Sequence, residues 1–80
     1  MTFEAVVETE DEGVFVVVPF DAKAEFGAAR APVTVTVNGF TWDSTVAVYG
    51  GRSYLPLRRG VRQAARIEPG DTVTVTVEPR

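Results

Sequence analysis

The sequence has 80 residues, of which 45% are hydrophobic and 24% are charged, and its formal net charge is −3. This length and balance predict one small folded domain over residues 1–80 and argue against disorder. The chain contains neither cysteine nor histidine, which excludes disulfides, thiolate chemistry, Ser-His-Asp catalysis and the usual zinc or copper ligands. Neither of the two glycine-rich sequence motifs that bind nucleotides is present. From the missing metal ligands and the missing nucleotide motifs, we expect no metal site and no cofactor.

The distribution of apolar residues bears on the location of the protein. The longest apolar run, from Val14 to Phe20, is much shorter than the roughly 20 residues that a membrane-spanning helix needs. The N-terminus carries acidic residues where a signal peptide has basic residues followed by an apolar segment. We therefore expect a cytoplasmic protein with no signal peptide and no membrane partner.

Two strands joined by a turn are expected at the N-terminus. Residues Thr2 to Glu8 alternate between apolar and polar with the period of a half-buried strand. Val14 to Val18 is β-branched or aromatic throughout, which is typical of a central strand covered on both faces. The polar segment 10–13 between them predicts a hairpin turn, whose acidic residues either face solvent or bind a cation.

A short helix and a third strand follow. Asp21 is placed to cap a helix over residues 22–26, and Gly27 is placed to end that helix. Residues 28–32 are expected to connect it to the next strand. Val33 to Val37 alternates valine with threonine, so we expect a strand with its valines inward and its threonines outward.

Two tight hairpins are expected in the middle of the chain. Asn38-Gly39 predicts a type I′ turn, because both central residues of that turn need positive φ. Gly50-Gly51 predicts a second two-residue turn. These turns bound a long strand over residues 40–49 and lead into another strand over residues 52–57.

The last third of the chain combines a cationic helix with a closing strand. Residues 58–67 have the narrow apolar stripe of a helix that packs on one side. That stripe consists of Leu57, Val61, Ala64 and Ala65. Residues 68–71, Glu-Pro-Gly-Asp, place proline and glycine where a type II turn requires them. Thr72 to Val77 is the final predicted strand.

The chain also contains a weak internal repeat. Residues 17–20 (VVPF) parallel residues 54–57 (YLPL), a helical stretch follows each, and the sequence VTVTV at 33–37 recurs at 73–77. The predicted order is therefore ββαβ–ββαβ, with six strands and two short helices. Short strands, tight turns and period-two alternation favour a mainly β fold, a closed or nearly closed β-barrel with helices covering its ends. We interpret it as two related half-barrels that form a pseudo-dimer within one chain.

An arginine-rich segment is the candidate binding site. Arg58, Arg62 and Arg66 are spaced so that a helix places them in one row, and Arg59 lies beside them. These side chains could clamp a phosphate or a carboxylate by bidentate pairing, with Trp42 as a stacking surface. In the structural alternative, the arginines pair with acidic residues of the first half of the chain and solvate the helix, and Trp42 anchors the core.

Carboxylate pairs are the remaining candidates for catalysis, since two of them can hydrolyse a glycoside. Asp21, Asp43 and Asp71 are the candidates by position. However, Asp21 is more simply a helix cap, Asp71 is the last residue of a turn, and Asp43 is expected to face solvent. We therefore predict no catalytic residue and no enzymatic activity.

The order of the motifs resembles a known family. The matching segments are FEAVV at 3–7, VPF at 18–20, VTVTVNGF at 33–40, LPLxxxVRxA at 55–64 and GDTV at 70–73. They are similar to a small bacterial family of unknown function that is found alone or ahead of a YdeI/OmpD-associated segment. The resemblance implies a double-split β-barrel, a pseudo-dimeric relative of AbrB-like DNA-binding proteins. It implies no established activity and no catalytic residues.

Together these features favour a non-enzymatic binding or interaction module for an anionic ligand or a protein partner. The alternatives are an AbrB-like DNA-binding protein and, third, a small-molecule enzyme. A sequence pI of about 4.8 counts against nucleic acid as the partner. Because both half-barrels are expected within one chain, we predict a monomer.

Overall fold

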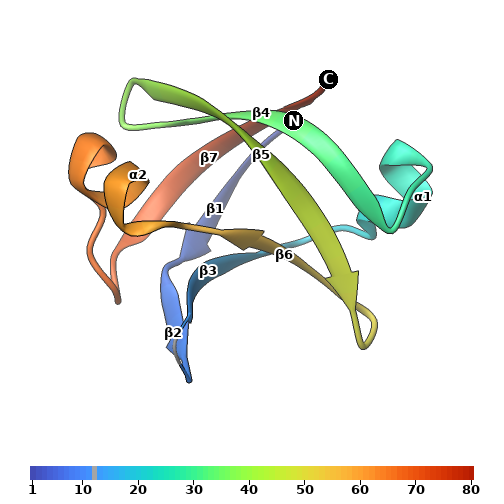
Figure 1. The fold of residues 1–80 in the computed structure, drawn as a ribbon, viewed down its shortest axis with the longest axis horizontal. Coiled ribbons are helices and arrows are strands. Elements are labelled where there is room, and N and C mark those ends of the chain that lie inside the picture. Colours follow the sequence, from blue (N-terminus) through green and yellow to red (C-terminus); the bar gives the residue numbers. More distant parts are fainter. Residues whose placement is uncertain (12) are drawn as a thin grey trace.

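The computed structural model describes residues 1–11 and 13–80. In this part of the chain it contains seven strands and two short helices, so the mainly β fold is confirmed. The elements are β1 (Thr2–Val6), β2 (Glu8–Glu10), β3 (Gly13–Val18), α1 (Ala22–Phe26), β4 (Arg30–Val37), β5 (Phe40–Tyr49), β6 (Arg52–Pro56), α2 (Arg59–Ala65) and β7 (Thr72–Pro79). Figure 1 shows one strongly curled sheet with the two helices at opposite sides. Neither helix has the length and apolar character needed to cross a membrane, among the residues described.

The two predicted tight turns form as expected. The central residues of Asn38-Gly39 have φ values of 52° and 79°, and those of Gly50-Gly51 have 54° and 79°. Positive φ at both positions gives a turn whose twist matches that of the flanking strands. As a result, β5 pairs antiparallel with β4 on one side and with β6 on the other. The predicted turn over residues 10–13 includes Glu12, which lies outside the described residues.

The first predicted strand is divided at Val7, and this corrects the expected count of six strands. The strand order is β1-β7-β4-β5-β6-β3-β2, so β1 and β2 lie at opposite edges of the sheet although one residue separates them. The sheet must therefore curl until its edges meet at Val7. The Val7 N–H donates to the Asp71 carbonyl and the Val7 carbonyl accepts from the Gly70 N–H, both at 2.8 Å. These bonds tie Val7 to the turn before β7, which leaves β1 to pair with β7 and β2 with β3.

The core lies on the inner face of the curled sheet and consists largely of valine. The predicted alternation in β4 is confirmed, because its valines at 33, 35 and 37 are buried and its threonines are not. The largest fully buried side chains are Val7, Val16, Val33, Val35, Val37, Val46, Leu55, Val75 and Val77. Removal of these side chains from water is the main term that stabilises the fold.

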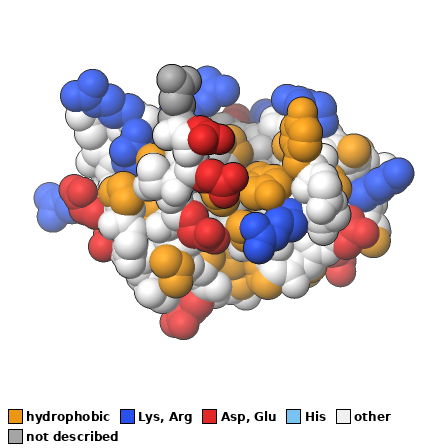
Figure 2. Space-filling view, turned by 90° about the horizontal axis from the view of Figure 1, so that it is seen from below, with side chains coloured by type: hydrophobic (Ala, Val, Ile, Leu, Met, Phe, Trp, Pro, Cys, Tyr) orange, Lys and Arg blue, Asp and Glu red, His pale blue; other side chains and the backbone are white. Residues whose placement is uncertain are grey.

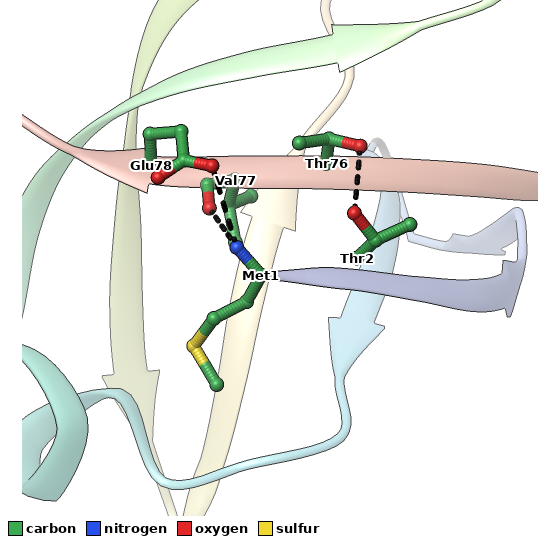
Figure 3. A network of polar contacts seen from close by, with 5 residues as sticks. All are labelled: Met1, Thr2, Thr76, Val77 and Glu78. Carbon is green, nitrogen blue, oxygen red and sulfur yellow. Dashed lines mark hydrogen bonds and ion pairs between the residues drawn. The ribbon is translucent and has the colours of Figure 1, made fainter.

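The N-terminus is fastened to the last strand (Figure 3). The Met1 ammonium donates to the Val77 carbonyl at 2.7 Å and lies 3.6 Å from a Glu78 carboxylate oxygen. The hydroxyls of Thr2 and Thr76 share a hydrogen bond of 3.0 Å on the outer face. These contacts, together with the β1–β7 ladder, join the two ends of the chain.

Helix α1 has the predicted bounds and the predicted caps. An Asp21 carboxylate oxygen accepts hydrogen bonds from the Lys23 and Ala24 N–H groups. Gly27 ends the helix in the left-handed conformation, and its N–H donates to the Lys23 carbonyl. Both arrangements satisfy backbone groups that a helix end leaves without intrahelical partners.

Helix α2 is shorter than predicted, and its inward face departs from the predicted stripe at one residue. It ends at Ala65, because Arg66 adopts the left-handed conformation (φ 58°) and closes the last turn. Asn38 also holds this end, since its side-chain amide donates to the Ala65 carbonyl at 2.7 Å. The predicted apolar stripe is wrong at Ala64, which is exposed, whereas Ile67 beyond the helix is buried.

Strand β4 starts three residues before the predicted Val33 and contains a proline. Pro32 lies opposite Thr45 of β5, and its carbonyl accepts from the Arg80 N–H at 3.1 Å. The proline backbone is therefore directed away from β5, so no bond to β5 is lost. This placement explains why residues 30–32 form strand where the sequence predicted a connection.

A buried hydrogen bond between strand and helix gives the first testable prediction. Ser53 is buried in β6, and its hydroxyl accepts from the N–H of Ala22 at 3.0 Å, at the start of α1. We expect Ser53→Ala to lower the free energy of unfolding by about 1–3 kcal/mol, because a buried N–H loses its partner. Urea unfolding measures this change. The control Thr41→Val removes an exposed hydroxyl and should cost less than about 0.5 kcal/mol, so equal losses would contradict the prediction.

Candidate functional site

A groove opens where β5 separates from β6. Strand β5 pairs with β4 along residues 40–47, whereas it pairs with β6 only along residues 47–49. In Figure 1 the two strands meet at their hairpin and diverge towards α2. A hollow of about 580 Å³ lies here, lined by residues of β3, β5, β6 and α2 together with Arg30 and Arg80. We call it the β5–β6 groove, and its volume falls within the range of small-ligand sites.

Aromatic side chains form one part of the lining. Phe15 and Tyr54 pack edge to face with ring centroids 5.2 Å apart. Trp42 also lines the groove, and its ring stacks on Phe40 at 5.8 Å with an interplanar angle of 22°. All four rings are half-buried, so each keeps part of its surface accessible. Phe40 and Trp42 also pack against the core, as the structural alternative for Trp42 predicts, and the accessible parts of the rings give the groove an apolar portion.

Arginines form the other part of the lining. Arg30, Arg58 and Arg80 line the β5–β6 groove, and Arg80 lies 3.4 Å from a carboxylate oxygen of Asp43. A second hollow of about 300 Å³ shares Arg58 with the groove and adds Arg59 and Arg62. Arg58 thus stands at the junction of the two hollows, in an extended conformation just before α2.

A family model matches most of the chain. Residues 3–77 match the family model described as a domain of unknown function (DUF1905). The chain belongs to the DUF1905 family. The match spans every groove-lining residue except Arg80, so the groove is built from the family domain itself. No curated protein matches the chain.

The structure of this DUF1905 domain brings together four of the five predicted site residues. Arg58 and Trp42 line the β5–β6 groove, and Arg59 and Arg62 line the hollow next to it. Arg66 lines neither hollow. The predicted helical row of Arg58, Arg62 and Arg66 is wrong at both ends, because only Arg62 lies within α2, while Arg58 is the extended N-cap residue and Arg66 the left-handed C-cap residue.

Two further arginines in the groove were not found from the sequence. Arg30 lies opposite Ala47 in the β4–β5 ladder, and Arg80 is placed beside Asp43 by the bond from its N–H to Pro32. Both positions depend on the pairing register of strands far apart in the chain. No local motif in the sequence indicates that they meet.

The structural alternative for the arginines has two parts, pairing with acidic residues and solvation of the helix. The described residues do not show the pairing, whereas Arg58, Arg59 and Arg66 are exposed. Within residues 1–11 and 13–80, the ion pairs are Met1–Glu78 and Arg80–Asp43. None of the four predicted arginines pairs there with an acid. Arg62 is partly engaged by the fold, since its Nε donates to the Leu57 carbonyl at 3.0 Å.

The three candidate carboxylates each have a structural partner in this DUF1905 domain. Asp21 caps α1, and an Asp71 oxygen accepts from the Glu68 N–H at 2.9 Å. Asp43 is exposed as predicted, accepts from the Thr34 hydroxyl at 3.2 Å and faces Arg80. In the described part of the chain, no three acidic side chains are grouped so that they could hold a metal ion.

The surface around β2 and β3 carries hydrophobic, acidic and basic side chains. Figure 2, viewed from the end where these two strands project, shows hydrophobic side chains open to solvent between acidic and basic ones. Tyr49, at the β5–β6 hairpin, is the most exposed large hydrophobic side chain among the described residues, at 74%.

Proposed function

We propose that this domain is a non-enzymatic binding module that takes an anionic ligand or an anionic segment of a protein partner in the β5–β6 groove. The observation that carries the proposal is the position of Arg58, which lies at the junction of two hollows and has no acidic partner among the described residues. A guanidinium in such a place can bind a carboxylate or phosphate by two parallel hydrogen bonds. The adjoining aromatic rings favour a ligand that also has an apolar part.

The start of α2 supports a binding role for its arginines. Arg58 is the N-cap residue, makes no side-chain cap bond, and is followed by Arg59, with no acidic residue in the first turn. Positive charge at the N-terminal end of a helix is unfavourable because of the helix dipole. An arrangement that costs stability at a groove is expected where the charges serve binding.

We also propose that the domain is a pseudo-dimeric double-split barrel built from an internal repeat. The pairing register supports this: Val17 lies opposite its repeat equivalent Tyr54 in the β3–β6 ladder, and Thr36 lies opposite its equivalent Thr76 in the β4–β7 ladder. In both pairs a residue lies opposite its own equivalent in the other repeat, as it must where a two-fold axis passes between two strands. Since the curl of the sheet already brings both edge strands together, we propose that the domain acts as a monomer.

A difference between the two halves supports a binding site in the second half only. By the same two-fold relation Phe3, opposite Val75, corresponds to Trp42, opposite Val35. Phe3 packs against Phe20, which packs against Phe26, so three rings fill the space beside α1. Trp42 stacks instead on Phe40, and the repeat equivalent of Phe20 is the smaller Leu57. The position beside α2 that corresponds to Phe20 is therefore filled by a smaller side chain than its counterpart beside α1.

A thermal-shift screen tests the proposed function. The panel contains anionic metabolites, nucleotides, acidic peptides and short DNA and RNA, each at low and physiological salt. We expect one class to give a saturable rise in Tm, because a ligand at about 100 times its Kd stabilises by about 2.7 kcal/mol. Arg58→Gln should reduce this shift. The matched control Arg52→Gln, outside both hollows, should keep it. No shift from any class, or an equal loss in both variants, would contradict the proposal.

A further inference from the structure

One edge of β5 faces the groove with its backbone groups free. In a two-residue hairpin the residues that flank the turn exchange hydrogen bonds, so Phe40 bonds to Val37 of β4. The N–H and C=O groups of a strand point to alternate sides along the chain. The groups of Trp42 and Ser44 therefore point to β4, whereas those of Asp43 and Thr45 point the other way.

Two hydrogen bonds agree with this alternation. The N–H of Val48, which has the same parity as Ser44, donates to the Ala29 carbonyl on the β4 side at 2.8 Å. On the opposite strand, the carbonyl of Pro32 accepts from the Arg80 N–H, so it is directed away from its neighbour Thr45. Thr45 therefore has no backbone bond to β4.

The next strand does not satisfy these groups either. Pairing between β5 and β6 starts only at Ala47, so among the described residues no strand partners the outward side of Asp43 and Thr45. Both residues line the groove. On the facing wall, Pro56 has no N–H to offer, and the Leu57 N–H donates to Val14 of β3. The β5 wall of the groove therefore presents backbone groups that could pair with another strand, and the facing wall presents side chains.

The charges in the groove select the kind of strand that fits. Three arginines line the groove, Arg30, Arg58 and Arg80. Asp43 is the single acidic residue among the described lining residues, and it already faces Arg80. A partner strand with acidic side chains would meet guanidinium groups on its charged face. Its apolar side chains, on the other face, could pack on the half-buried ring of Trp42, which the register places on the face opposite to Arg30.

We infer that the occupant of the β5–β6 groove is an extended acidic peptide of a partner protein, which adds to the sheet as an extra strand along residues 43–45 of β5. The inference rests on the proposed function and names its partner. Backbone bonds to β5 supply affinity, and the arginines select acidic side chains, as in other cases of strand addition.

Amide hydrogen exchange tests the free edge directly. In the protein alone, the amides of Asp43 and Thr45 should exchange rapidly, whereas those of Trp42 and Ser44 should be protected by β4. Addition of an acetylated, amidated hexapeptide that alternates valine and glutamate should slow exchange at Asp43 and Thr45 by at least tenfold. Exchange that is slow at these two amides in the free monomer would overturn the inference.

Modified peptides separate strand addition from charge attraction. The fluorescence of Trp42, the single tryptophan of the chain, reports binding. One peptide is N-methylated at every valine and another at every glutamate, so the two have the same charge and the same number of methyl groups. In an extended peptide the N–H groups of alternate residues point to opposite sides, so each peptide loses its hydrogen bonds on one side only. We expect the peptide whose methyl groups point away from β5 to bind as the parent does, and the other to bind at least tenfold more weakly. Equal binding of both would overturn strand addition while leaving anion binding in place.

Two further outcomes distinguish this inference from the proposed function. If small anions bind and the parent peptide does not, the partner class is wrong and the proposed function stands. If nothing anionic binds, both fail. A doubled mass with protection of Asp43 and Thr45 in the protein alone would show that a second copy of the chain covers the edge, which also overturns the inference.

A protein variant gives an independent check. Thr45→Pro removes the N–H that faces the groove and should weaken the parent peptide at least tenfold. Proline is tolerated at a strand position whose N–H has no ladder partner, as with Pro32 directly opposite. The matched control Thr9→Pro, on the edge strand β2 outside the groove, should keep binding. If Thr45→Pro does not fold, the N-methylated peptides alone decide the question.

Discussion

Replacement of Leu55 by alanine is expected to lower the free energy of unfolding by about 2–5 kcal/mol. Leu55 has 0% exposure in β6, a strand that pairs with both β3 and β5. The cavity left by the substitution lies between strands that cannot close over it without loss of their ladders. A domain of this size has a total stability of about 4–12 kcal/mol, so the change removes a large share.

Urea unfolding followed by circular dichroism measures the effect of Leu55→Ala. The midpoint should fall while the m-value stays the same, because the loss is one of stability and not of native structure. Val6→Ala is the control, since Val6 is 51% exposed and should change stability by less than about 0.5 kcal/mol. Equal effects of the two substitutions would show that the core is not centred on the inner face of the sheet.

Arg58→Asp is expected to stabilise the fold and to abolish most of the binding. Aspartate at the N-cap can accept a hydrogen bond from the first turn of α2, which Arg58 does not do, and this contributes about 1 kcal/mol. It also places a negative charge at the favourable end of the helix. Loss of a charged hydrogen bond to the ligand, about 1.5–3 kcal/mol, should weaken anion binding by roughly tenfold or more.

The two effects of Arg58→Asp are measured separately, by urea unfolding and by titration with the anion class found in the thermal-shift screen. Arg52→Asp makes the same change of charge outside the groove and should leave binding within about twofold, since Arg52 contacts neither hollow. If Arg58→Asp destabilised the domain and kept its affinity, the arginine would be a structural residue. That outcome would contradict the proposed function.

Much of the site could be predicted from the sequence, but its geometry could not. Arg58 and Arg59 were visible as part of a cationic segment, and Trp42 as an aromatic on a neighbouring strand. The error at Arg66 arose because helical spacing was extended beyond Ala65. Asn38, far away in the chain, holds that end of the helix through its bond to the Ala65 carbonyl.

The local structure of this domain follows from short stretches of its sequence. Turns such as Asn38-Gly39, the Asp21 cap and the valine–threonine alternation depend on the conformational preferences of a few adjacent residues, and all of them form as predicted. Strand division at Val7 and the entry of Arg30 and Arg80 into the groove were decided only by the tertiary structure. They depend on which distant strands pair and in which register, and on how far β5 diverges from β6. These properties belong to the whole curled sheet, because a strand carries the same alternation whichever neighbour it pairs with.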